Sequence, residues 1–266
     1  MPSLQRIVPA SLVAVAIALS AAACSAGTSS AGTSSAGASG GSSGSGTPTA
    51  DASAFSGMTA DQIVQKSVDD LKAAKSLTIS GNVVSSGTSI KISLTDVAAQ
   101  GCTGTIGLAS SSTAAGSTMS GTADLVEVGD VVYMKLDQSF FKNLGLPSSL
   151  FTTITGKFIK VTSKSELANF AQMCDASTLA SGFDKEVTGF VKDGTATIDG
   201  QPVAAFKQPT HAGSGIVYIS ESSTPEIVRL QGPASEGQIN FTNYNASTTI
   251  TAPAASEVID GSKFGL

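Results

Sequence analysis

The sequence holds few side chains that could perform catalysis. A serine or cysteine nucleophile needs a base within hydrogen-bonding reach, and His211 is the only imidazole among the 266 residues. It follows Pro209 in a turn-rich stretch that ends at Gly215, where we expect a solvated loop. Two G-x-S-x-G strings, at 37–41 and 40–44, lack the strand before and the helix after that a nucleophile elbow needs. The sequence therefore predicts a protein that is not an enzyme.

The composition argues against two further classes of function. The chain carries 15 Lys and Arg against 20 Asp and Glu, a net charge of −5, with no basic run and no Trp. Neutralising the phosphates of a nucleic acid needs clustered Lys and Arg, so we expect no nucleic-acid partner. With Cys24 set aside, one His and two Cys are left for the folded part, too few ligands for a closed zinc site of the usual Cys/His type. We expect neither a metal nor another cofactor.

The N-terminus has the features of an export signal. After Arg6, residues 7–23 are uncharged and mostly apolar, and the stretch ends in small residues before Cys24. A charged start, an apolar middle and a small-residue end are typical of a secretory signal. The stretch is short, rich in Ala and interrupted by Pro9, whereas a membrane-spanning helix needs about 20 strongly apolar residues. We therefore predict a signal peptide over residues 1–23.

The residues before Cys24 resemble the lipobox of bacterial lipoproteins. In that motif the chain is cleaved directly before a cysteine whose thiol then carries diacylglycerol. This sequence departs from the motif at one position, where Ala21 stands in place of the usual Leu. The resemblance implies an acylated Cys24 that anchors the protein to the outer face of the cytoplasmic membrane or within the cell wall. Two or more acyl chains give stable anchoring, where one gives only marginal binding. Secretion with an unmodified Cys24 and an uncleaved anchor are the alternatives.

A low-complexity segment follows the cysteine. Every residue from 25 to 50 is Ser, Gly, Thr, Ala or Pro. Such a composition cannot bury enough apolar surface to offset the chain entropy that folding costs, so we predict a flexible tether over residues 24–56. A Gly/Ser-rich coil of this length has a root-mean-square span of about 30 Å, which is enough to hold a folded domain clear of a membrane.

Residues 57–266 are expected to form one α+β domain with an antiparallel sheet. Thr59 and Gln62 form a capping box ahead of apolar residues at helical spacing, and Ser163 with Glu166 forms a second one. Apolar and polar residues alternate elsewhere, which predicts strands with one solvated face. These strands are expected at 77–83, 90–94, 103–109, 118–128, 131–136, 186–192, 195–199, 202–207, 215–220, 226–231 and 237–243.

Counting the cysteines predicts one disulfide. If Cys24 is acylated, Cys102 and Cys174 are left as an even pair in an exported chain. Their bridge would close a long loop, which the chain-entropy model values at about 4 kcal/mol. Two buried free thiols are the alternative, and a redox-active pair is disfavoured because no C-x-x-C spacing is present.

Several short motifs carry a resemblance to a known family: Gly101 to Gly104, Val132 to Lys135, Phe140 to Lys142, Met173 to Asp175, Ile239 to Asn245 and Ile250 to Pro253. From about Thr59 to Asp260 the chain resembles a family of actinomycete lipoproteins, which is similar in turn to the wider LppX/LprG and LolA-like lipoproteins. The resemblance implies a half-barrel, in which a curved antiparallel sheet carries helices on its concave face around an apolar cavity that holds acyl chains. We expect a monomer.

Phenylalanine is concentrated in the middle of the domain. Seven of the 11 Phe lie between residues 140 and 190, and no charge occurs from Leu144 to Thr155. Pockets for small apolar ligands are lined mostly by such residues, although the same residues could instead fill a core. The candidate ligand-binding residues are Phe140, Phe141, Leu144, Leu150, Phe151, Ile154 and Phe170.

Two functions are compatible with these features. One is a membrane-anchored lipoprotein that binds or carries a lipid or another apolar ligand in a cavity between sheet and helices. The other is a non-catalytic surface lipoprotein that acts through protein contact, as a sensor, chaperone or assembly factor, without a ligand. A contiguous internal cavity would favour the first function, and a filled core would favour the second.

Overall fold

The structure is a computed structural model that describes residues 55–85, 87–110, 120–143, 148–161, 170, 173–181, 187–209, 215–233 and 235–264. Several predictions concern other residues. The signal peptide, Cys24 and the tether up to residue 54 lie outside the described residues, as do Leu144, His211 and the capping box that begins at Ser163.

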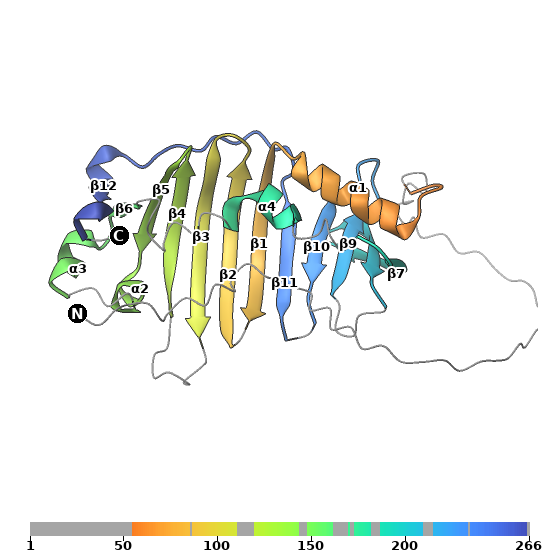
Figure 1. Ribbon diagram of the computed structural model, residues 1–266, viewed down its shortest axis with the longest axis horizontal. Helices are drawn as coiled ribbons and strands as arrows, with labels where there is room; N and C mark the ends of the chain where they lie inside the picture. Colours follow the sequence, from red (N-terminus) through yellow and green to blue (C-terminus); the bar gives the residue numbers. More distant parts are fainter. Residues whose placement is uncertain are drawn as a thin grey trace, which may run out of the picture.

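One open sheet of twelve strands makes up most of the described part of the chain (Figure 1). The strands are β1 Ser76–Ser85, β2 Thr88–Val97, β3 Gly101–Ser110, β4 Ser120–Val128, β5 Val131–Leu136, β6 Phe158–Val161, β7 Val191–Ile198, β8 Gln201–Lys207, β9 Ile216–Ser220, β10 Ile227–Gln231, β11 Gly237–Thr242 and β12 Val258–Asp260. Their spatial order is β12-β6-β5-β4-β3-β2-β1-β11-β10-β9-β8-β7. All neighbours are antiparallel except β12 and β6, which are parallel. The predicted α+β class with an antiparallel sheet is confirmed.

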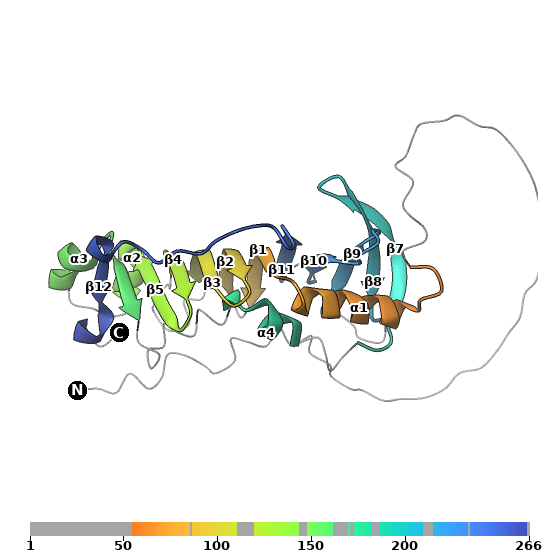
Figure 2. The ribbon, with the colours of Figure 1, turned by 90° about the horizontal axis from the view of Figure 1, so that it is seen from above.

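The helices of the described residues are short compared with the sheet. They are α1 Ala60–Lys72, α2 Gln138–Asn143, α3 Ser148–Ile154 and α4 Ala176–Ser181, with 3-10 turns η2 Ala255–Glu257 and η3 Gly261–Phe264. Seen from above, α1 and α4 lie on the same side of the sheet (Figure 2). We call this side the helix-bearing face and the opposite side the outer face. No helix within the described ranges combines the length and the apolar character needed to cross a membrane.

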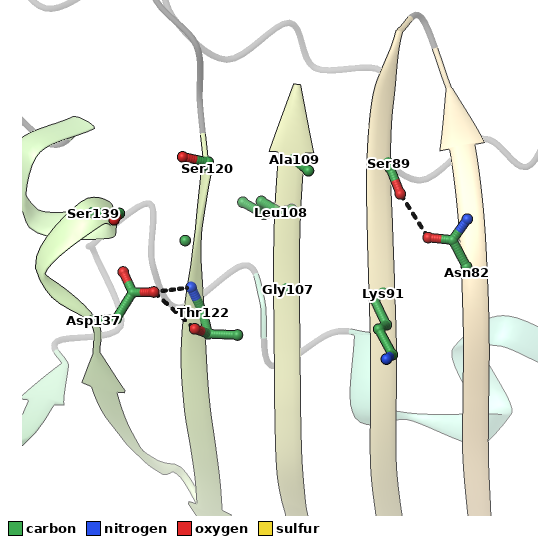
Figure 3. Close-up of a pocket in the computed structure, with 11 residues that line it drawn as sticks. Asn82, Ser89, Lys91, Gly107, Leu108, Ala109, Ser120, Thr122, Asp137 and Ser139 are labelled. Atoms are coloured by element: carbon green, nitrogen blue, oxygen red, sulfur yellow. Dashed lines mark hydrogen bonds between the residues drawn. The ribbon is translucent and has the colours of Figure 1, made fainter. Parts of the chain in front are cut away.

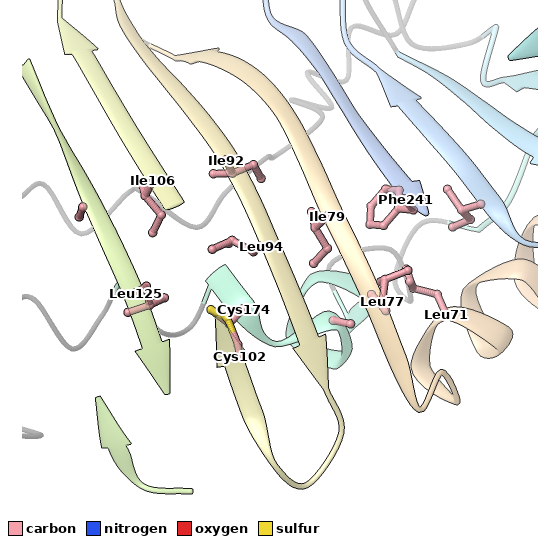
Figure 4. Packing of buried hydrophobic residues seen from close by; sticks show 14 of the residues in the cluster. Leu71, Leu77, Ile79, Ile92, Leu94, Cys102, Ile106, Leu125, Cys174 and Phe241 are labelled. Carbon is pink, nitrogen blue, oxygen red and sulfur yellow. A yellow bond between two sulfur atoms is a disulfide. The ribbon is translucent and has the colours of Figure 1, made fainter. Parts of the chain in front are cut away.

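Alternating side chains separate the two faces of the central strands. In β2, Ile92 and Leu94 are buried whereas Ser93 between them is exposed. Leu94 lies opposite Ile79 of β1 in the register. These apolar side chains join Leu71 of α1 in one core cluster (Figure 4). An antiparallel sheet with one buried and one solvated face is the arrangement that the alternation predicts.

The first helix begins where its capping box predicts. The hydroxyl of Thr59 accepts a hydrogen bond from the Gln62 N–H at 3.3 Å, and the Thr59 N–H donates to Gln62 Oε1 at 2.8 Å. These two bonds satisfy backbone groups that the first turn leaves unpaired. One stripe of α1 packs on the sheet, and its buried residues are Ile63, Val64, Ser67, Val68 and Leu71.

One pair of predicted strands is a single strand in the structure. The sequence predicts separate strands at 186–192 and 195–199, but a single strand, β7, begins only at Val191 and continues to Ile198, with a shift of register between Lys192 and Thr195, and residues 187–190 are not in a strand. Gly194 has φ of +100°, a conformation that glycine adopts without steric cost. The backbone therefore bulges at Gly194 instead of ending the strand.

Candidate functional site

A disulfide joins Cys102 to Cys174 (Figure 4). Their Cα atoms are 5.8 Å apart, and both side chains are buried. The bridge links β3 to the residue two positions before α4, which is 72 residues further along the chain. It therefore fastens the start of α4 to the helix-bearing face. This pairing is the one that the cysteine count favours over two free thiols.

Asp175 caps the N-terminus of α4. Its carboxylate accepts hydrogen bonds from the N–H groups of Ser177 at 2.8 Å and Thr178 at 3.2 Å, and from both hydroxyls at 2.7 Å. Partial burial acts to raise the pKa of Asp175, but these hydrogen bonds outweigh it and hold the pKa below its ordinary value. The sequence analysis did not predict this helix, although an aspartate followed by Ser and Thr is an N-cap signal.

Two carboxylates flank the disulfide on the helix-bearing face. In the register of the sheet, Cys102 lies between Asp96 of β2 and Glu127 of β4. Burial raises the pKa of Asp96, and a hydrogen bond from the Ala176 N–H opposes this only in part. Burial also raises the pKa of Glu127, with a smaller contribution from the negative charge of Asp96. The charged forms of both groups are therefore disfavoured in the folded protein.

Three candidate ligand-binding residues are part of the core. Phe140 and Phe141 of α2 and Ile154 of α3 are each no more than 3% exposed. The two Phe are in the core because α2 lies close to β4. A Cβ added to Gly121 of β4 would lie 2.8 Å from the backbone N of Phe140, so this approach requires glycine. These three side chains fill space at one end of the sheet and do not line an open pocket.

Three other candidates, Leu150, Phe151 and Phe170, are half-buried around the same core. Phe151 stacks on Phe141 with ring centroids 6.0 Å apart, and Phe170 meets Phe140 edge-on at 6.1 Å. Such pairs contribute beyond the area that they bury. The structure thus brings six of the seven candidates into one cluster, and only the half-buried three present apolar surface. Leu144, the seventh, lies outside the described residues.

An apolar strip of half-buried side chains crosses the helix-bearing face. Val83 of β1 lies opposite Ile90 of β2, and Leu230 of β10 lies opposite Ile239 of β11. Because β11 pairs with β1 so that Ile239 lies opposite Gly81, the two pairs lie in adjacent rows across four neighbouring strands. All four are partly exposed, whereas the apolar residues further along the same strands are buried. The sequence analysis did not single out these residues, since their proximity depends on the pairing of β1 with the distant β11.

Two open hollows are lined by residues other than those of the apolar strip. The larger, of about 470 Å³, lies over β2, β3 and β4 and has Asn82, Ser89 and Lys91 in its lining (Figure 3). The smaller, of about 350 Å³, lies between Tyr133, Lys160 and the segment that leads into β12. Both linings are rich in polar side chains. Neither hollow has the character of the apolar cavity that the resemblance implies.

Charged side chains in the described part of the chain often pair with each other near the surface. Lys135 contacts Asp124 at 2.7 Å, and Lys207 contacts Asp193 at 2.6 Å. Within the described ranges, no group of three or more His, Cys, Asp or Glu is placed to hold a metal ion. Away from Asp96 and Glu127, the partly exposed side chains of the apolar strip give the helix-bearing face apolar contact area.

Comparison with solved structures yields a lipoprotein neighbour, whereas no protein-family model and no curated protein sequence matches the chain. LprF is a structural neighbour. Its crystal structure, from Mycobacterium bovis, matches 73% of this chain and 97% of the LprF chain, with 14% sequence identity and a TM-score of 0.49. LprF is an LppX/LprG-type lipoprotein, the group that the sequence motifs resemble.

Proposed function

We propose that this protein is a lipoprotein, anchored outside the cytoplasm through an acylated Cys24, that binds an acyl chain or another apolar ligand. In this proposal the sheet is a half-barrel whose concave face carries the helices, and the ligand lies between the two. Residues 24–56 act as a flexible tether behind a cleaved signal peptide at 1–23. The protein performs no chemistry on its ligand and works as a monomer.

The apolar strip is the observation that carries the proposal. Val83, Ile90, Leu230 and Ile239 are partly exposed on the face that bears α1 and α4. Covering apolar surface gains about 25 cal/mol per Å², and each CH₂ of a buried chain contributes about 0.8 kcal/mol. An acyl chain laid along the strip would be held by this burial alone. Such a site requires no cofactor.

A surface lipoprotein that acts through protein contact is the second candidate. It is favoured by the burial of Phe140, Phe141 and Ile154, because these side chains fill the end of the domain that the sequence assigned to the ligand. In this reading the helix-bearing face stabilises the fold, and function lies in surfaces that meet a partner. The two candidates differ in whether the apolar strip takes up lipid.

A titration with a fluorescent fatty acid tests the proposal. The full chain carrying Cys24→Ala is purified without detergent and stripped of lipid. We expect binding at micromolar concentrations, and we expect Ile90→Gln combined with Leu230→Gln to weaken it about tenfold, which corresponds to about 1.4 kcal/mol. The melting temperature should fall by only a few degrees, because both side chains already reach solvent.

Ile216→Gln is the matched control for this titration. Ile216 is a half-buried isoleucine of β9 that alternates with the core residue Val217 and so lies on the outer face. The control variant should bind fatty acid like the parent chain. If the stripped parent chain binds neither fatty acids nor phospholipids at micromolar concentrations, the lipid-binding proposal is wrong and the protein-contact function takes its place.

A further inference from the structure

The outer face of the central strands is polar but nearly free of charge. Lys91 is the one charged residue among the described outward-facing positions of β1, β2 and β3. A solvated protein surface usually carries about 25–35% charged residues. Hydroxyl and amide groups take their place here, chiefly on Thr78, Asn82, Ser93, Thr95, Thr103 and Thr105. The outer face of these strands therefore presents many uncharged hydrogen-bonding groups and few charges.

The register of the sheet sets these hydroxyl groups in rows that run across the strands. Ser80 lies opposite Ser93, and Ser93 lies opposite Thr105. In the adjacent row, Thr78 lies opposite Thr95. Neighbouring strands are about 4.8 Å apart, so each row repeats a hydroxyl at roughly the length of one sugar ring in an extended polysaccharide.

Hydrogen bonds between side chains hold part of this array in place. The hydroxyl oxygens of Thr78 and Thr95 are 3.2 Å apart, and the Ser89 hydroxyl donates to Asn82 Oδ1 at 2.6 Å. Side chains that are already fixed lose little conformational entropy when a ligand binds to them. The outer face is therefore prepared to accept hydrogen bonds from a ligand and to donate them.

The larger hollow lies over one end of the array (Figure 3). Gly107 of β3 lies in it between Lys91 and Thr122 on the two adjacent strands. A Cβ added to Gly107 would meet these two side chains only at 3.7 Å, an ordinary contact distance. The absence of a side chain at Gly107 therefore leaves space above the strand that a ligand group could occupy.

We propose that this hollow and the adjoining hydroxyl rows bind an uncharged glycan. Hydroxyl and amide groups combine donors and acceptors, as the hydroxyls of sugars do. The hollow is lined by one cation, Lys91, and one carboxylate, Asp137, which gives little attraction for a phosphate-rich polymer, whose binding depends on many Lys and Arg contacts. The rows offer little apolar area to an acyl chain. The glycan site lies on the opposite side of the sheet from the apolar strip and does not depend on the proposed lipid binding.

Co-sedimentation with insoluble chitin, cellulose and linear mannan tests this site. The full chain carrying Cys24→Ala is compared with the same chain carrying Ser93→Ala, Thr103→Val and Thr105→Val, which lose three hydroxyls of the outer face with little change in shape. We expect the parent chain to bind at least one of the three glycans and the triple variant to bind it about tenfold more weakly. Gly107→Phe, which fills the hollow, should have the same effect.

Thr195→Val with Thr197→Val is the matched control, because both hydroxyls are exposed on β7 at the edge of the sheet. This variant should bind the glycan like the parent chain, and all variants should melt within a few degrees of it. The proposal is overturned if the parent chain binds none of the three glycans, if the triple variant binds as well as the control, or if a polyanion such as heparin competes the glycan away.

Discussion

The carboxylate of Asp137 accepts a hydrogen bond from the backbone N–H of Phe140 at 2.8 Å, which makes Asp137 the N-cap of α2. Its second oxygen accepts from the N–H and the hydroxyl of Thr122, each at 2.7 Å. One side chain thus joins the start of α2 to β4. Partial burial alone would raise the pKa of Asp137, but these hydrogen bonds outweigh it and lower the pKa.

Removing this carboxylate should destabilise the domain. We expect Asp137→Ala to lower the free energy of unfolding by about 2 kcal/mol, since both the helix cap and the link to β4 are lost. Urea denaturation at neutral pH measures the change. Asp69→Ala is the control: the exposed Asp69 carboxylate accepts a hydrogen bond from Gln65 Nε2 within α1, and this substitution should cost less than about 0.5 kcal/mol.

The same variant should show its effect only while Asp137 is ionised. A carboxyl group whose pKa is lower in the folded state contributes stability above its unfolded pKa and loses it as pH falls through the folded pKa. The difference in stability between the parent chain and Asp137→Ala should therefore shrink below about pH 4. A difference that stays constant down to strongly acidic pH would contradict the assigned hydrogen bonds.

Glu127 should behave in the opposite way. Its pKa is raised by burial and by the nearby charge of Asp96, so the folded state disfavours the carboxylate. We expect Glu127→Gln to raise the melting temperature at pH 7 and to have no effect once the pH is below the unfolded pKa of glutamate, because the carboxyl group is then neutral in both states. Glu257→Gln, at an exposed position, is the control and should change the melting temperature at neither pH.

The disulfide should supply a large part of the stability. We expect replacement of Cys102 and Cys174 by Ser to cost about 4 kcal/mol and to loosen α4, whose N-terminus the bridge holds. Thermal unfolding with and without reductant, together with non-reducing peptide mapping, measures this. Free thiols at both positions in exported protein, or unchanged melting on reduction, would show that the bridge does not form.

Local patterns predicted the elements whose stabilising contacts are near in sequence. The capping box of Thr59 marks α1, and alternation predicts strands at 118–128 and 131–136, which pair as β4 and β5 with Val128 opposite Val131. Each of these signals lies within a few residues. The sequence was therefore sufficient for the central hairpins and for the first helix.

Elements that depend on distant partners were not predictable in this way. β12 has three residues and pairs in parallel with β6, where Val258 lies opposite Phe158. A strand this short has no measurable alternation. The apolar strip likewise requires β1 and β11 to meet, and Gly81 lies opposite Ile239 across that pairing. For the candidate site, composition identified the Phe cluster but could not separate buried Phe141 from half-buried Phe151.

The lipid anchor is tested by removing its attachment point. If Cys24 carries diacylglycerol, Cys24→Ala should move the protein from the membrane fraction to the medium, because a Ser/Gly-rich tether gives no other hold on a membrane. Fractionation followed by immunoblotting measures this, with Ser25→Ala as the control that should stay in the membrane fraction. Retention in the membrane of a Cys24→Ala variant from which residues 1–23 have been removed would refute acyl anchoring.

Aspartate substitutions in the Phe cluster distinguish core from ligand surface. Phe141 is fully buried, so Phe141→Asp places an unpaired charge in the core and should unfold the domain, a loss above about 4 kcal/mol. Phe151 stacks on Phe141 but is partly exposed. The carboxylate that Phe151→Asp introduces can reach water. This variant should therefore keep a cooperative thermal transition, with a melting temperature lowered by several degrees.

The uptake of fluorescent fatty acid by Phe151→Asp decides the role of this ring. If Phe151 borders the ligand, the folded variant should bind the probe at least about tenfold more weakly than the parent chain, while the conservative Phe151→Leu retains binding. If Phe151→Asp unfolds as completely as Phe141→Asp, the ring is part of the core. Normal uptake by a folded Phe151→Asp variant would remove the α2–α3 end from the ligand site and leave the apolar strip of Val83, Ile90, Leu230 and Ile239 as the surface to test.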